Sequence, residues 1–215
     1  MKLEIQEIRQ KKNAWDCGIA CVQMILKYYN INKNYEDLTK EITVYKNIGT
    51  YMPQLGLYFL EKGLKTKIIT MNQYIFTKQD MNKTQKEILE LIKKLLKEPK
   101  KERFKKPLEY YKKYLEKGGE IEIKIPTKND IQKSIQKKEP LIVNLTTNFL
   151  VLDKPIFNLH YNTIYGIDEQ HIYAIDPRAD EKGGKQKYTY EEYMYAIHST
   201  NFADIDNGTI MTIKK

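Results

Sequence analysis

Apolar residues in the first third of the chain recur at helical spacing. Between Cys17 and Tyr29 they cover more than one side of a helix, which predicts a buried helix with Asp16 as its N-cap. Similar patterns predict short helices at 35–42 and 51–62, the second ending before a glycine. Alternating apolar and polar positions predict a short strand or an extended entry at 3–8 and a strand at 64–70.

The middle of the chain carries two amphipathic patterns separated by a basic linker. Residues 83–97 and 107–117 each place an apolar stripe opposite lysines, and Pro107 suits a first helical turn. We expect these segments to form a helical hairpin joined by residues 99–106.

Strand patterns dominate the remainder. We expect strands at 120–125, 141–145, 160–166, 172–175 and 209–213, with helices at 127–137, capped by Thr127, and at 189–198. Helices followed by a meandering sheet predict the α+β class, with the N-terminal helices packed on a C-terminal antiparallel sheet.

Composition excludes several classes of protein. The 215 residues are 41% hydrophobic and 30% charged, as in a folded globular chain, and no apolar run approaches the roughly 20 residues of a membrane span. No signal peptide is recognisable at the start, so we expect a cytoplasmic protein. Cys17 and Cys21 lie four residues apart, a poor spacing for a disulfide, and are interpreted as free thiols.

The net charge of +9 is concentrated in one segment. Residues 82–118 contain 13 Lys and Arg against 6 Glu and so contribute +7. Lysines spaced from glutamates as Lys94 is from Glu90 favour a solvated helix face, with an acidic partner as the functional alternative. Nucleic acid is not the expected partner.

Cys17 is the candidate nucleophile. It stands at a predicted helix start, where unpaired N–H groups and the helix dipole stabilise a thiolate, and its own N–H could face a developing oxyanion. Gly18 would leave the approach to the sulfur open. Cys21, one turn deeper, is interpreted as a small core residue.

His160 is the candidate base among three histidines. It opens one strand, and Asp176 closes the next, so antiparallel pairing would bring them together at one end of the sheet. We expect His160 Nδ1 to bond Asp176 and the other nitrogen to face Cys17, with Asp168 as the next candidate for the orienting role. His171 and His198 are interpreted as structural.

Two motifs carry a resemblance to a known family. Gln10-Lys-Lys-Asn-Ala-Trp-Asp-Cys17-Gly-Ile-Ala-Cys21 resembles the nucleophile motif of the papain-like double-glycine (bacteriocin-processing) leader peptidases. His160-Tyr, Gly166-Ile-Asp168 and Tyr173-Ala-Ile-Asp176-Pro177 resemble that family's second motif. The likeness covers residues 1–72 and 120–215.

The resemblance implies a papain-like fold and a cysteine peptidase. It implies Cys17 as nucleophile, His160 as base, Asp176 as orienting group and a Gln10 amide in the oxyanion hole. Gln10 stands seven residues before the cysteine, where the family usually has six. Residues 1–215 are then one papain-like domain acting on a peptide or protein substrate, with 82–118 a basic helical-hairpin insertion.

Three other functions remain open on the residues alone. An acyl-enzyme could pass to an amine instead of water, giving an acyltransferase of the transpeptidase or transglutaminase type. The basic 82–118 segment could make the chain a non-catalytic binding module. A metal site using Cys17, Cys21 and His160 lacks an obvious fourth ligand, and no metal or cofactor is expected.

Overall fold

The computed structural model describes residues 1–12, 14–98, 104–151, 157–202 and 208–215. Among these residues the strands form one seven-stranded sheet in the order β2-β1-β7-β3-β4-β5-β6. The strands are β1 (Lys65–Thr70), β2 (Glu120–Ile123), β3 (Leu141–Thr146), β4 (Leu159–Ile167), β5 (His171–Asp176), β6 (Gly184–Thr189) and β7 (Ile210–Lys214). All neighbouring pairs are antiparallel except β1 with β2.

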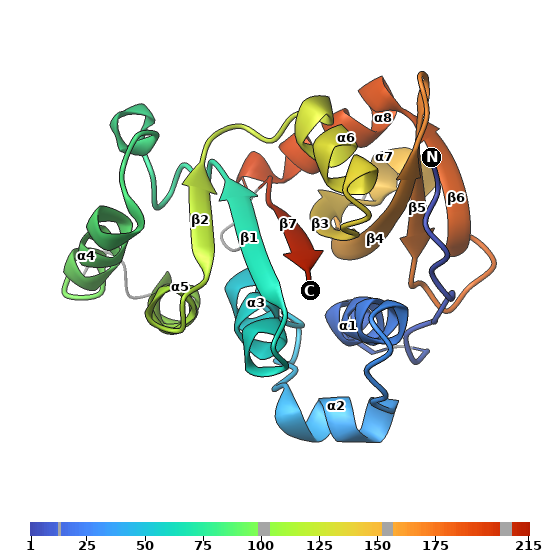
Figure 1. Cartoon of the computed structure of the whole chain (residues 1–215), viewed down its shortest axis with the longest axis horizontal. Helices are drawn as coiled ribbons and strands as arrows, with labels where there is room; N and C mark the ends of the chain where they lie inside the picture. The colour runs from blue at the N-terminus through green and yellow to red at the C-terminus, as the bar shows by residue number, and fades with distance from the viewer. Residues whose placement is uncertain (13, 99–103, 152–156, 203–207) are drawn as a thin grey trace.

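Helices cover both faces of the sheet. They are α1 (Cys17–Tyr28), α2 (Tyr35–Glu41), α3 (Met52–Glu61), α4 (Gln85–Leu95), α5 (Lys105–Glu116), α6 (Lys128–Gln136), α7 (Asn148–Val151) and α8 (Tyr190–His198), with 3-10 turns η1 (Lys78–Asp80) and η3 (Ser199–Phe202). In Figure 1 α1, α2 and α3 lie below the sheet, and α6, α7 and α8 lie above it. Every residue of β3 is buried, as expected for a strand covered on both sides.

The expected α+β class is confirmed, with one addition and two corrections. The parallel pair β1 and β2 extends the antiparallel sheet on the side of α4 and α5. Of the two alternatives at 3–8, the strand is wrong: no strand forms there, and an isolated bridge between Lys2 and Gly166 and a hydrogen bond from Leu3 N to Tyr165 O join this end of the chain to β4. Sequence reasoning also missed β6, because its Gly-Lys-Gln-Lys start carries no apolar alternation.

The basic segment forms the two expected helices. α4 and α5 contact each other, and α5 also packs on α3 and β2. Residues 99–103 of the expected linker lie outside the described residues. That 82–118 is an insertion into the domain remains a prediction.

Tyr114 ties α5 to the sheet. Its side chain is fully buried, and its hydroxyl accepts a hydrogen bond from Thr66 Oγ1 at 3.0 Å. The same hydroxyl lies 2.9 Å from the carbonyl oxygen of Thr66 and 3.1 Å from that of Glu120, as a donor. One side chain of α5 therefore bridges β1 and the start of β2.

No helix in the described part of the chain is long and apolar enough to cross a membrane.

Removal of the Tyr114 hydroxyl tests this bridge. We expect Tyr114→Phe to lower the free energy of unfolding by about 1–3 kcal/mol, because buried polar groups of β1 and β2 lose their partner. Urea denaturation measures the change. Tyr195→Phe is the control, since Tyr195 is 59% exposed. Equal stability of the two variants would show that the bridge contributes nothing.

Candidate active site

The side chain of Asp16 does not cap α1. Asp16 occupies the N-cap position and is buried, but its carboxylate makes no bond to the amides of the first turn. Its Oδ2 instead accepts hydrogen bonds from the Tyr35 hydroxyl at 2.5 Å and from Lys11 N at 3.4 Å. The Asp16 side chain thus does not occupy the N–H groups at the positive end of α1, where Cys17 stands.

Gly18 has a different role from the one expected. A Cβ at this position would lie 2.2 Å from Thr50 Oγ1 and 3.1 Å from Leu55 Cδ1. The missing side chain therefore lets α1 pack closely on the segment that leads into α3.

His160 and Asp176 meet across two paired strands. Thr163 on β4 lies opposite Ile175 on β5, so the same register places Asp176 opposite Asn162. His160 precedes Asn162 by two residues and shares its face of the sheet, which makes His160 and Asp176 diagonal neighbours. Both side chains are buried, and His160 Nε2 lies 2.7 Å from Asp176 Oδ1.

The expected choice of imidazole nitrogen is wrong. Nε2, not Nδ1, contacts Asp176, which leaves Nδ1 on the side of Cys17. The physical reason is reach: a diagonal pair is more widely spaced than a directly opposite one, and Nε2 extends farther from the backbone than Nδ1. Asp176 Oδ1 also accepts a hydrogen bond from Arg178 N at 2.9 Å, which fixes the carboxylate.

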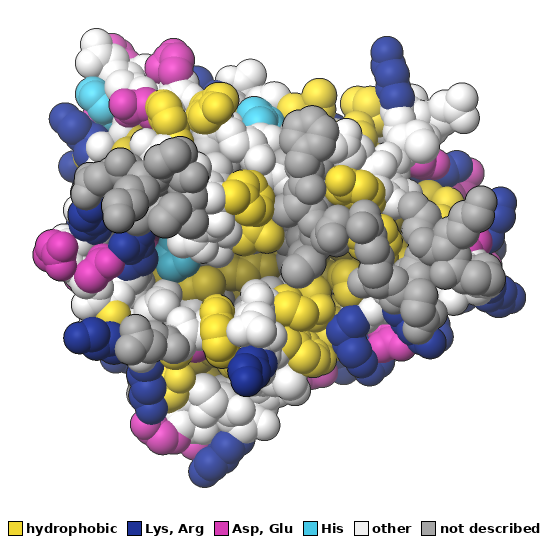
Figure 2. Space-filling view, turned by 180° about the vertical axis from the view of Figure 1, so that it is seen from behind, with side chains coloured by type: hydrophobic (Ala, Val, Ile, Leu, Met, Phe, Trp, Pro, Cys, Tyr) yellow, Lys and Arg dark blue, Asp and Glu magenta, His cyan; other side chains and the backbone are white. Residues whose placement is uncertain are grey.

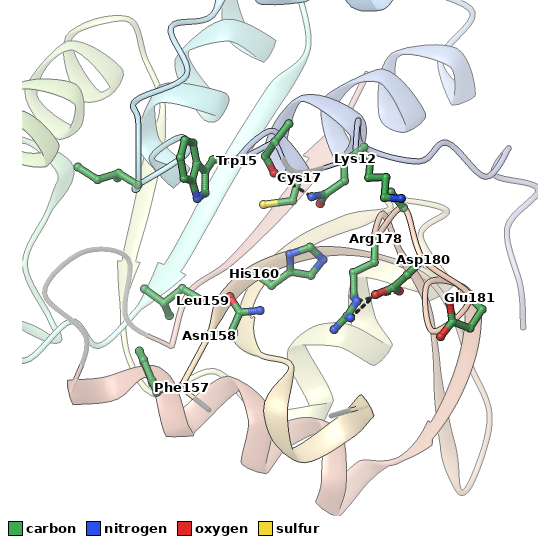
Figure 3. Close-up of a pocket in the computed structure, with 14 residues that line it drawn as sticks. Lys12, Trp15, Cys17, Phe157, Asn158, Leu159, His160, Arg178, Asp180 and Glu181 are labelled. Carbon is green, nitrogen blue, oxygen red and sulfur yellow. Dashed lines mark hydrogen bonds and ion pairs between the residues drawn. The ribbon is translucent and has the colours of Figure 1, made fainter. Parts of the chain in front are cut away.

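Charge around His160 favours its protonated form. Burial by itself would lower the pKa of the imidazole, but the carboxylate of Asp176 and the sulfur of Cys17 together raise that pKa to about 10. A hydrogen bond with the Cys17 side chain contributes to this rise. In Figure 3 the Cys17 and His160 side chains lie next to each other across the pocket.

Gln10 lies in the same pocket as Cys17 and His160. Its backbone N–H donates to Pro177 O at 2.7 Å, and its side-chain Nε2 donates to Ala14 O at 3.0 Å. An amide nitrogen carries two hydrogens, so one N–H of Gln10 is used within its own loop and the second is free of that bond.

Apolar and charged residues line different sides of the pocket around Cys17. Its volume is about 850 Å³. Figure 3 shows Trp15, Leu159 and Phe157 on one side of the Cys17–His160 pair. The other side is lined by Lys12, Arg178, Asp180 and Glu181. In Figure 2 hydrophobic side chains gather across the middle of this face of the molecule, with charged side chains toward its edges.

The two halves of this pocket were not predicted from the sequence. Trp15 and Phe157 are 46% and 56% exposed, and they come from segments far apart in the chain. The available signal was Trp15, a large apolar residue directly before the Asp-Cys pair and outside the predicted helix. No local pattern marks Phe157 or Asp180.

The remaining sequence candidates have different surroundings. Cys21 is fully buried, and burial raises the pKa of its thiol well above the ordinary value. Asp168 stands in the β4–β5 turn, where it accepts a hydrogen bond from the Tyr173 hydroxyl at 2.6 Å and lies 3.3 Å from His171 Nδ1. Burial lowers the pKa of His198, the last residue of α8.

Comparisons with known proteins agree with this architecture. Residues 5–89, which contain Gln10 and Cys17, match the model of the peptidase C39 family. A comparison with curated protein sequences finds no match.

Two solved structures share the fold. One is a double glycine motif protease from an AMS/PCAT transporter in complex with the leader peptide, 16% identical with a TM-score of 0.50, covering 99% of this chain and 93% of that chain. The other is a C39-like peptidase from Bacillus anthracis, 16% identical with a TM-score of 0.50, covering 100% of this chain and 98% of that chain. Their likeness extends over the C-terminal sheet that the family match does not reach. The chain is a cysteine peptidase of the papain-like α+β fold, similar through residues 5–89 to the peptidase C39 family.

Proposed function

We propose that this chain cleaves a peptide bond with a Cys17–His160–Asp176 triad. The supporting observation is the buried 2.7 Å contact between His160 Nε2 and Asp176 Oδ1, together with the rise of the His160 pKa beside Cys17. A protonated imidazole beside a cysteine favours the thiolate, which is the reactive form in such sites. Asp176 stabilises the imidazolium and holds the ring.

The proposed reaction has two chemical steps. The thiolate of Cys17 attacks the carbonyl carbon of the scissile bond, and His160 Nδ1 gives its proton to the leaving amine. A water molecule, deprotonated by His160, then attacks the thioester carbonyl, the C–S bond breaks, and the carboxylic acid product leaves with the Cys17 thiolate and the His160 imidazolium restored. The acyl-enzyme is thus formed and consumed at one sulfur atom.

The Cys17 N–H and the Gln10 amide are proposed to hold the oxyanion. Cys17 opens α1, so its N–H has no partner within the helix. The second N–H of Gln10 Nε2 is the other donor, because the first already bonds Ala14 O. Removal of one such donor from an oxyanion hole costs roughly 10²–10³ in rate in other enzymes.

A peptide is the proposed substrate. The structurally similar double glycine motif protease is seen in complex with its leader peptide. In this chain the apolar half of the pocket, with Trp15 and Phe157, suits apolar side chains on one side of the scissile bond. The charged half suits a polar or charged segment on the other side.

Selective alkylation tests the nucleophile. We expect iodoacetamide at pH 7 to label Cys17 at least about tenfold faster than Cys21, because Cys17 lies in the pocket beside His160 while Cys21 is fully buried. Peptide mass spectrometry of the folded protein measures both rates. His160→Ala should slow the labelling of Cys17, with His198→Ala as control. Equal rates for the two cysteines would contradict the proposal.

Titration of His160 tests the role of Asp176. In Asp176→Asn the carboxylate that stabilises the imidazolium is gone, so we expect the pKa of His160 to fall from about 10 toward or below its ordinary value of 6.5. The imidazolium then disappears at lower pH than in the natural protein. NMR of the histidine ring nitrogens follows this titration, with His160→Gln for assignment.

Asp168→Asn is the matched control for that titration. It removes a carboxylate that contacts His171 and not His160. The pKa of His160 should be the same in this variant as in the natural protein. An unchanged pKa in Asp176→Asn would contradict the triad.

We further propose that α4 binds an acidic protein segment. Lys86 and Lys94 lie on α4, Lys97 follows two residues after its end, and all three are exposed. Figure 1 places α4 at the end of the molecule beyond β2, far from α1, and Figure 2 shows Lys and Arg side chains along that end. Charge at such a distance affects encounter and partner choice and not the chemical step.

Neutralisation of these lysines tests the second proposal. We expect Lys86→Gln, Lys94→Gln and Lys97→Gln together to weaken binding to a poly-glutamate peptide by about tenfold at low salt, with less effect at high salt. Fluorescence anisotropy measures the binding. The control combines Lys40→Gln, Lys46→Gln and Lys65→Gln, which are also exposed. An equal effect of both triple variants would indicate net charge alone and contradict specific binding at these three lysines.

A further inference from the structure

The segment before the nucleophile is fastened to the loop that follows Asp176. Arg9 Nη1 donates to Arg178 O at 2.7 Å and to Asp180 O at 3.0 Å. The next residue, Gln10, donates from its backbone N–H to Pro177 O at 2.7 Å. Three carbonyl groups of one loop, those of Pro177, Arg178 and Asp180, therefore accept hydrogen bonds from two neighbouring residues of the N-terminal segment.

Glu7 completes this attachment. Its Oε1 accepts the Arg9 Nε–H at 2.6 Å, and its Oε2 accepts the N–H of Lys185, at the start of β6, at 3.1 Å. The guanidinium is thus bound by the Glu7 carboxylate through Nε and by the loop carbonyls through Nη1. We call Glu7, Arg9 and their partners in residues 177–185 the Arg9 clasp.

Two glycines make room for the guanidinium. A Cβ on Gly183 would lie 2.2 Å from Arg9 Nη1, and a Cβ on Gly184 would lie 2.5 Å from Arg9 Nη2. Gly184 also has a φ of +91°, a conformation that other residues rarely adopt. The guanidinium therefore lies directly against the backbone of the β5–β6 loop, although the Arg9 side chain is 37% exposed.

The clasp connects two parts of the proposed site. On the loop side, Arg178 N donates to Asp176 Oδ1, the same oxygen that contacts His160 Nε2. On the segment side, Gln10 is the residue next to Arg9 and lines the pocket with Cys17. Arg9 itself is not among the residues that line this pocket.

We propose that Arg9 is a positioning residue, which fixes the Gln10 amide relative to the His160–Asp176 pair by clamping residues 7–10 on the 177–184 loop. This proposal rests on the proposed function, because Gln10 matters only if Cys17 attacks a carbonyl group. Arg9 touches no reacting atom and acts through the backbone of Gln10. A guanidinium suits the task since its planar fork can bind two carbonyls and a carboxylate at once.

Two reagents separate the oxyanion hole from the nucleophile. p-Nitrophenyl acetate acetylates the Cys17 thiolate through a tetrahedral oxyanion, forming a thioester and releasing p-nitrophenolate. Iodoacetamide alkylates the same sulfur by direct displacement of iodide, with no oxyanion. The ratio of the acylation rate constant to the alkylation rate constant therefore measures the contribution of the oxyanion hole. A loss of folding or of the thiolate would slow both reactions and leave no selective fall in acylation.

We expect Arg9→Met to lower the acylation rate of Cys17 by about tenfold and to leave its alkylation rate within about twofold of the natural protein. Gln10→Ala should show the same selective loss. Arg9→Lys, which keeps the charge without the fork, should fall between. Lys11→Met is the control: it removes one positive charge from the same segment, and its side chain lies over the Tyr35 ring.

The double variant identifies the route of the effect. If Arg9 acts through Gln10, Arg9→Met combined with Gln10→Ala should acylate no more slowly than Gln10→Ala alone. An unchanged rate ratio in Arg9→Met would overturn the proposal, as would losses that multiply in the double variant. Failure of the proposed function itself gives a different result, namely a Cys17 in the natural protein that is alkylated no faster than Cys21.

Discussion

The antiparallel pairing of β4 with β5 sets the distance between His160 and Asp176, and the other parts of the site are placed relative to these two residues. The register makes them diagonal neighbours, so only Nε2 of the imidazole reaches the carboxylate. Nδ1 is then directed away from Asp176 and toward α1. A shift of one residue in this register would turn the two side chains to opposite faces of the sheet.

The position of α1 depends on a close approach to the segment before α3. Gly18 leaves no room for a side chain beside Thr50, and Asp16 is bound to Tyr35 of α2 instead of to the helix that it precedes. Packing and hydrogen bonding thus hold the start of α1 from outside the helix. The Asp16 side chain consequently does not bind the amide groups of the first turn, at the end where the helix dipole favours negative charge.

The chain also separates the site from its most basic part. α5 is anchored by Tyr114 to β1 and β2, at the opposite end of the sheet from β5 and β6. The buried hydroxyl of Tyr114 makes α5 part of the core, while α4 presents lysines beyond it. A partner bound at α4 would therefore not contact Cys17. It would affect which substrate is recognised and not the chemical step.

Local pattern was sufficient for most elements, and it singled out Cys17 as the candidate nucleophile. Helical spacing predicted α1 to α6 and α8 within a few residues, and alternation predicted every strand except β6, whose polar start has no periodic signal. The Asp-Cys-Gly start of a buried helix, and a histidine and an aspartate at the ends of successive strands, identified the candidate residues. These features are local because each depends on neighbours within a few positions along the chain.

Tertiary structure alone decided how those residues are used. It selected Nε2 over Nδ1, gave the Asp16 carboxylate to Tyr35, placed Thr50 against Gly18 and brought Arg9 onto the β5–β6 loop. Each of these is a contact between segments separated by many residues, and a hydrogen bond forms or fails over a fraction of an ångström. The sequence determined which side chains could do chemistry in this protein, whereas strand register and helix packing determined which atoms face one another.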